Sequence, residues 1–147
     1  MRSIFVRLHR WMGLTTALFL AVAGLTGSII AFNHELDEWL NPALFRVPVT
    51  GTALPALDLA RKIEHDNPRL HVSYIPLETE PGHAYVFGAT GYPDSANGAP
   101  AAAGYWQIFV NPYTGAKLGE REWGAFGLDR VHLIPFLYLF HYSLYLP

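Results

Sequence analysis

Two histidines, His9 and His34, stand at opposite ends of a long uncharged stretch of this sequence. Imidazole is a common ligand of haem iron, so their relative placement decides whether one helix can offer both to haem. They are 25 positions apart. On an α-helix, at ~100° per residue, this separation falls about 20° short of seven full turns. Both side chains are therefore predicted to point from one helix face, one near each end.

The helix face between these histidines is built mostly from small residues. Small side chains let a second helix or a flat cofactor approach the backbone closely. Two histidines on such a face, one near each membrane surface, suit a pair of stacked membrane haems. The alternative is plain helix packing with two interfacial histidines. The residues within about 40° of His9 on the helical wheel are Gly13, Thr16, Leu20, Ala23, Gly27 and Ala31.

The element that positions these histidines is a predicted transmembrane helix. Residues 11–32 carry no charge and would form roughly 33 Å of helix, enough to cross a bilayer core of ~30 Å. A cleavable secretory signal is the alternative, with 21–23 as the cleavage site. The apolar run continues beyond that site, which favours an uncleaved anchor. Charges differ in sign on the two sides: Arg2, Arg7 and Arg10 precede the run, and Glu35, Asp37 and Glu38 follow it.

This charge asymmetry predicts the orientation of the chain. Basic flanks stay in the cytoplasm, so the N-terminus is predicted to be cytoplasmic and residues after about 33 periplasmic, in a bacterial inner membrane. The acidic residues after the helix are predicted to form a solvated collar rather than a metal site.

Composition narrows the classes of function. The chain has 147 residues, which suffices for an anchor and one small domain, and its net charge of -2 gives no basic field for nucleic acid. It has no cysteine, which excludes disulfides, iron–sulfur clusters and cysteine nucleophiles within this chain. Neither a dinucleotide-binding glycine motif nor a hydrolase triad motif is present.

The middle of the chain predicts a small α+β module. Residues 33–40 are predicted to extend the anchor helix, 44–55 to form an extended linker, and 57–65 to form a helix. Strands are predicted at 71–77, 83–89 and 105–110, with a turn at 111–115 leading back into 117–118 and a loop over 91–104. We therefore expect one helix followed by an antiparallel sheet.

The last part of the chain turns apolar again. Residues 131–147 carry no formal charge and are predicted to begin a second membrane helix, cut off at the end and broken at Pro135. A re-entrant or interfacial segment is the alternative. Three parts are thus predicted: an anchor with its extension (1–40), a periplasmic α+β module (41–130), and the start of a second membrane helix (131–147).

Three motifs give the sequence a family resemblance: LHRWMGL before the apolar run, NPYTGAKLGER in the module and FHYSLYLP at the end. Together they resemble the PepSY-associated transmembrane helix family of bacterial inner-membrane proteins, some of which act as siderophore reductases. Members have about four membrane helices and PepSY-like periplasmic modules. This chain resembles the N-terminal portion of such a protein.

The resemblance implies b-type haem held between histidines of different helices. Carried onto this sequence, the haem-iron ligands would be His9 on the cytoplasmic side, and His34 and His141 on the periplasmic side. His34 and His141 could share one iron. His9 lacks a second histidine on its side, so missing helices of a longer protein or a second copy would complete that site. His132 is a weaker alternative to His141. His71 and His83 are expected to be exposed, and His65 lies at the polar end of a predicted helix.

Two functions of different classes remain open. The first is a haem-containing electron-transfer protein that reduces a ferric siderophore or another ferric chelate in the periplasm, with this portion alone inactive. The second is a non-enzymatic, membrane-anchored PepSY-type binding or regulatory module. Four aromatic residues could line a contact surface for the chelate, although sheet core or membrane-surface anchoring is the preferred reading of them: Tyr105, Trp106, Tyr113 and Trp123.

Overall fold

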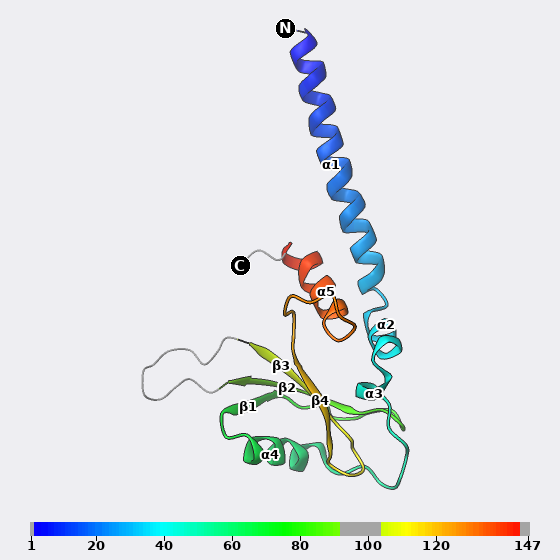
Figure 1. Cartoon of the computed structure of the whole chain (residues 1–147), viewed down its shortest axis with the longest axis vertical. Helices are drawn as coiled ribbons and strands as arrows, with labels where there is room; N and C mark the ends of the chain where they lie inside the picture. Colours follow the sequence, from blue (N-terminus) through cyan, green and yellow to red (C-terminus); the bar gives the residue numbers. More distant parts are fainter. Residues whose placement is uncertain (1, 92–103, 145–147) are drawn as a thin grey trace, which may run out of the picture.

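The first helix dominates the shape of the molecule. A computed structural model describes residues 2–91 and 104–144. Its helix α1 (Arg2–Ile30) has 29 residues, and its most apolar window has a mean hydropathy of 1.8. It is the one helix among the described residues that is long and apolar enough to cross a membrane. Residues 2–21 are all exposed, and α1 projects away from the rest of the chain (Figure 1).

The predicted extension of the anchor forms a separate helix. A turn at residues 31–32 divides α1 from α2 (Asn33–Leu40). The Asn33 side chain donates a hydrogen bond to the Ile30 carbonyl (2.7 Å), which competes with the helical backbone bonds at this point. Pro42 then starts the short α3 (Pro42–Phe45). The prediction of one continuous helix was therefore wrong at the 31–32 turn.

The module contains a four-stranded antiparallel sheet in the order β1-β2-β3-β4. Its strands are β1 (Leu70–Tyr74), β2 (Tyr85–Gly91), β3 (Tyr105–Val110) and β4 (Lys117–Glu122). The three predicted strands are confirmed, the first two with shifted ends and the third with the predicted ends. The Asn111 side chain accepts backbone N–H bonds from Tyr113 (2.9 Å) and Thr114 (3.2 Å), which fixes the predicted turn between β3 and β4. Most of the predicted 91–104 loop lies outside the described residues.

Helices cover both faces of the sheet. The predicted helix is α4 (Ala56–Asp66), and its Leu59 joins Phe87, Ile108 and Val110 in the buried core. On the other face, Phe45 of α3 packs against Phe109, with ring centroids 5.0 Å apart. Alternate residues of β3 therefore face α4 and the α2–α3 pair, as the pleat of a strand requires.

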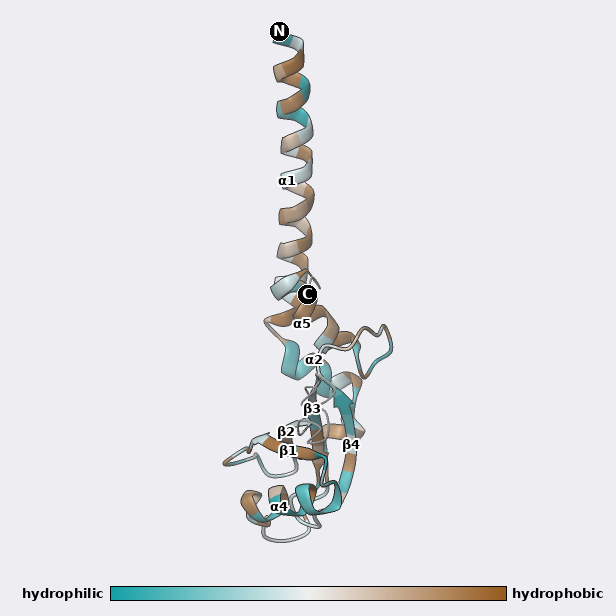
Figure 2. Cartoon of the chain, turned by 90° about the vertical axis from the view of Figure 1, so that its left-hand side faces the viewer, coloured by the Kyte–Doolittle hydropathy of each residue, from teal (hydrophilic) through white to brown (hydrophobic). Residues whose placement is uncertain are grey.

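The C-terminal apolar segment forms α5 (Leu133–Ser143), which lies against α1 and contacts α2. Pro135 lies in the first turn of α5, where no intrahelical N–H bond is lost, so the predicted break at Pro135 was wrong. Figure 2 shows that α5 and most of α1 are apolar, with hydrophilic turns near the N-terminus of α1, whereas α2 is polar. The predicted fold class is confirmed: a membrane-type helix, a small α+β module and a second apolar helix.

Candidate functional site

His141 of α5 lies against α1, where its ring nitrogen Nδ1 is 2.9 Å from the Thr26 hydroxyl oxygen. Thr26 is 8% exposed, and its hydroxyl also lies 2.8 Å from the Val22 carbonyl oxygen. A hydroxyl has one hydrogen to donate. When Thr26 donates it to Val22, as threonine does within helices, it must accept a hydrogen from Nδ1 of His141. That arrangement leaves the lone pair of a neutral imidazole on Nε2.

Gly27 allows this close approach. A Cβ atom at position 27 would lie 3.2 Å from Cε1 of His141, so a larger residue would press on the ring. Of the small-residue face predicted for α1, Gly27 contacts His141 and Ala23 lines the pocket beside it, whereas Gly13 has open space beside it. Between α1 and α5 lies a pocket of about 310 Å³, whose lining includes Phe19, Val22, Ala23, Thr26, Phe140 and His141.

His34 lies in a different environment. Its ring meets Phe45 edge-on at a centroid distance of 5.8 Å. It lines a pocket of about 360 Å³ between α2 and the sheet. This pocket and the one beside His141 share no lining residue. A haem iron shared by His34 and His141 stays a prediction.

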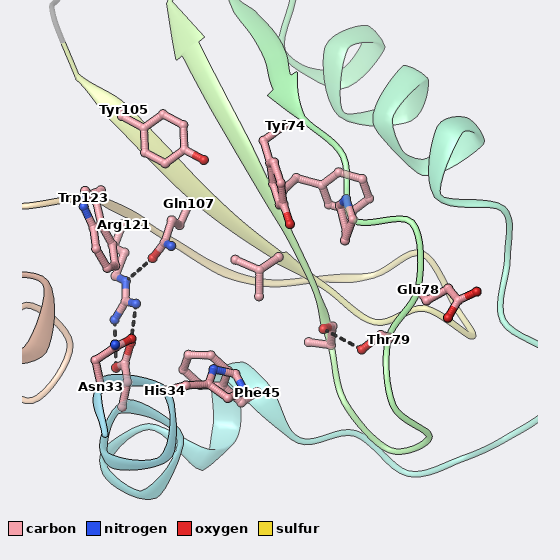
Figure 3. Close-up of a pocket in the computed structure, with 15 residues that line it drawn as sticks. Asn33, His34, Phe45, Tyr74, Glu78, Thr79, Tyr105, Gln107, Arg121 and Trp123 are labelled. Atoms are coloured by element: carbon pink, nitrogen blue, oxygen red, sulfur yellow. Dashed lines mark hydrogen bonds and ion pairs between the residues drawn. The ribbon is translucent and has the colours of Figure 1, made fainter. Parts of the chain in front are cut away.

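Aromatic side chains from the sheet face His34 across this second pocket (Figure 3). The Tyr105 ring lies across Gly88, where a Cβ atom would fall 1.9 Å from its hydroxyl oxygen. Burial raises the pKa of the Tyr105 hydroxyl above its ordinary value of 10.0, and neighbouring Tyr74 adds to the rise. Tyr105 therefore remains a hydrogen-bond donor at neutral pH. Of the other predicted contact residues, Trp123 lines this pocket, whereas Trp106 packs against the core on the α4 side.

A buried ion pair between Asp37 and Arg121 forms one wall of this pocket (Figure 3). The Arg121 and Asp37 side chains are 1% and 6% exposed. Arg121 also donates to Gln107 Oε1 (2.9 Å) and to the Val131 carbonyl (2.8 Å), and Asn41 donates to Asp37 (2.9 Å). The pair thus joins α2, the sheet and the segment leading into α5.

The predicted solvated collar was therefore wrong for two of its three acidic residues. Asp37 is buried against Arg121, and the Glu38 carboxylate is paired with Arg46 and His83. Sequence reasoning missed this site, although Asn33, Asp37 and Asn41 recur every four residues. Such a polar stripe faces one direction on a helix and could have indicated a buried polar contact.

The remaining histidines occupy scattered positions. His9 is exposed on the first half of α1, His71 is exposed as predicted, and His65 is exposed at the end of α4. His83 is only partly exposed, because it lies between Glu38 and Glu80. His132 is bonded to Asp129 through Nδ1 (2.9 Å), so its ring is held in the loop before α5.

These features define an α+β module with a membrane anchor, α1, and a second apolar helix, α5, which contacts α1 through His141. The sequence comparison assigns the family. Residues 6–147 match the family described as "PepSY-associated TM region", and the chain belongs to this family. A comparison with curated proteins finds no match to the sequence.

Proposed function

We propose that this chain is part of a haem-containing electron-transfer protein of a bacterial inner membrane, which passes electrons to a ferric siderophore or another ferric chelate in the periplasm. One observation carries the proposal: Nδ1 of His141 lies 2.9 Å from the Thr26 hydroxyl oxygen, a contact that occupies this nitrogen and points to Nε2 as the one that would bind iron. Haem-ligating histidines require a free nitrogen lone pair, and a hydrogen bond at the other nitrogen fixes the ring.

The residues around His141 fit a haem ligand. Thr26 provides the acceptor for Nδ1–H, Gly27 leaves room for the ring, and the adjacent pocket is bordered by apolar side chains such as Phe19 and Phe140. Among the residues that the structure describes, His141 Nε2 has no hydrogen-bond partner. When bound between two histidines, haem iron changes oxidation state without needing an open coordination position.

A second histidine that would hold the haem on this side has two candidate sources. One is His34, and the other is a histidine from a further helix of a longer protein or from a second copy. His9 would serve a second haem near the cytoplasmic surface, again with a partner from outside this chain. Reduction of Fe(III) to Fe(II) weakens its binding to hard oxygen ligands, which would release iron from the chelate.

Optical spectra of membranes test the proposal. We expect membranes containing the chain, extended by further family helices, to show a reduced-minus-oxidised b-type haem spectrum that diminishes in His141→Ala. His34→Ala reports whether His34 is the partner of His141. His65→Ala is the matched control, because His65 is an exposed histidine at the end of α4. The proposal fails when the extended protein contains no haem.

A second candidate is a haem-free binding or regulatory module. The pocket between α2 and the sheet favours it, because aromatic and polar side chains converge there without any need for haem. On this alternative His141 only packs α5 against α1. Colourless membranes, together with a ligand or peptide whose binding is lost in Tyr105→Ala, would support it.

A further inference from the structure

Two large apolar side chains are exposed on the segment that joins β4 to α5. Phe126 is 68% exposed and Leu128 is 71% exposed. Exposed aromatic and leucine side chains this close together are a feature of surfaces that contact a partner or a membrane.

The segment lies at the level of α5 rather than beside the sheet (Figure 1). The Phe126 ring packs edge-on against Phe136, with centroids 5.1 Å apart. Phe136 belongs to the first turn of α5, and five positions later His141 contacts Thr26 of α1. The helix α5 therefore runs beside the apolar end of α1, and Phe126 lies at the depth at which α5 begins.

Charged residues follow this apolar pair directly. Asp129 and Arg130 are both exposed. Asp129 accepts bonds from the His132 ring and from the backbone N–H of Val131, and the His132 bond holds the pKa of this carboxyl below its ordinary value of 3.8. The loop is thus shaped by its own hydrogen bonds, and the Asp129 carboxyl marks the point where its polar part begins.

We propose that residues 125–128 form a membrane-contacting loop that inserts Phe126 and Leu128 into the bilayer interface on the side of the sheet. The partner is the lipid surface itself, because Phe126 packs on Phe136 of the apolar helix α5, which in turn lies against α1. Aromatic rings favour this interfacial zone, and the adjacent Asp129 and Arg130 suit the headgroup level. The loop would fix the depth and tilt of the module relative to the anchor.

Site-directed spin labelling tests this proposal, and the absence of cysteine from the sequence makes each introduced cysteine unique. The variants Phe126→Cys and Leu128→Cys carry a nitroxide label in the full chain, reconstituted into vesicles of phosphatidylethanolamine and phosphatidylglycerol. Leu57→Cys is the control, because Leu57 is 51% exposed on α4, at the opposite end of the molecule from α1. Accessibility to oxygen and to a water-soluble nickel chelate reports the environment of each label.

We expect labels at 126 and 128 to collide severalfold more with oxygen than with the nickel chelate, and the label at 57 to show the reverse. Nickel accessibility at 126 and 128 equal to that at 57 would place the loop in water and overturn the proposal. Protection from both reagents would also overturn it, because the loop would then be covered by protein. Phe126→Cys removes the ring contact with Phe136 and can disturb the loop, whereas Leu128→Cys removes no ring contact. The label at position 128 therefore tests the proposal independently.

Discussion

At the scale of single residues, the contact between the Thr26 hydroxyl and Nδ1 of His141 points to Nε2 as the nitrogen that would bind haem iron. We predict that Thr26→Val, which keeps the shape but removes the hydroxyl, weakens haem retention in the extended protein by about 10- to 100-fold, the usual effect of losing an outer-shell partner. The haem potential should also rise, because a ligand without this bond is less basic and stabilises Fe(III) less. Haem quantitation and redox titration measure the two effects.

Thr15 provides the matched control for this substitution. Its hydroxyl makes the same bond to the carbonyl four residues earlier (Trp11, 2.9 Å), but it is exposed and contacts no histidine. Thr15→Val should leave haem content and potential unchanged. Equal potentials in parent and Thr26→Val proteins, with haem present in both, would refute the role of Thr26 while leaving the haem proposal intact.

The residues of the candidate site differ in how far the sequence could predict them. His141 was found through its motif, and Gly27 through the helical wheel. Thr26 lies next to Gly27 in the chain but was not singled out, because its partner is 115 positions away. The Asp37–Arg121 pair spans 84 positions and was missed for the same physical reason: the sequence shows local periodicity, whereas burial of a charge depends on which distant element packs over it.

At the scale of secondary-structure elements, the Asp37–Arg121 pair connects the anchor to the module. We predict that Asp37→Asn lowers the free energy of unfolding of the module by about 3–5 kcal/mol, because the Arg121 guanidinium would remain buried without a counter-charge. Chemical unfolding in detergent, followed by tryptophan fluorescence, measures the change. Trp123 is a suitable reporter, since its ring lies 5.7 Å from the Arg121 guanidinium carbon.

Asp58→Asn controls for the loss of a carboxylate. Asp58 pairs with Arg61 on α4, but both side chains are largely exposed, so solvent screens the pair. Its removal should change the free energy of unfolding by about 0.5 kcal/mol or less. Similar losses in the two variants would show that the buried pair contributes no more than a surface pair.

Most elements were predictable because their signals are local. The uncharged apolar run predicted α1, and the helical spacing of Leu57, Ala60 and Ile63 predicted α4. Alternating side chains bounded by turn residues predicted the strands. The wrong predictions concern two places: one where a side chain ends a helix by bonding to its backbone, and one where a proline is tolerated because it lies in the first turn of a helix. Asn33 competes for the Ile30 carbonyl and ends α1, while Pro135 is harmless because it falls in the first turn of α5.

At the scale of the whole molecule, the polar module and the N-terminus of α1 lie at opposite ends (Figure 2). A spanning α1 therefore places them on opposite sides of the membrane, and the arginines at positions 2, 7 and 10 predict a cytoplasmic N-terminus. We predict that Ser73→Cys, on β1, reacts with a membrane-impermeant maleimide in intact spheroplasts, whereas Ser3→Cys reacts only after lysis. Both serines are exposed, so accessibility of the side chain does not bias the comparison.

The same pair of variants separates three arrangements of the chain. Labelling of Ser3→Cys alone in intact spheroplasts would show the opposite orientation. His141 would then lie near the cytoplasmic surface, from which a periplasmic ferric chelate could not receive electrons directly. Labelling of both would mean that α1 does not span the bilayer. Labelling of Ser73→Cys alone places Thr26, His141 and the Phe126 loop near the periplasmic surface, the arrangement that the electron-transfer proposal requires.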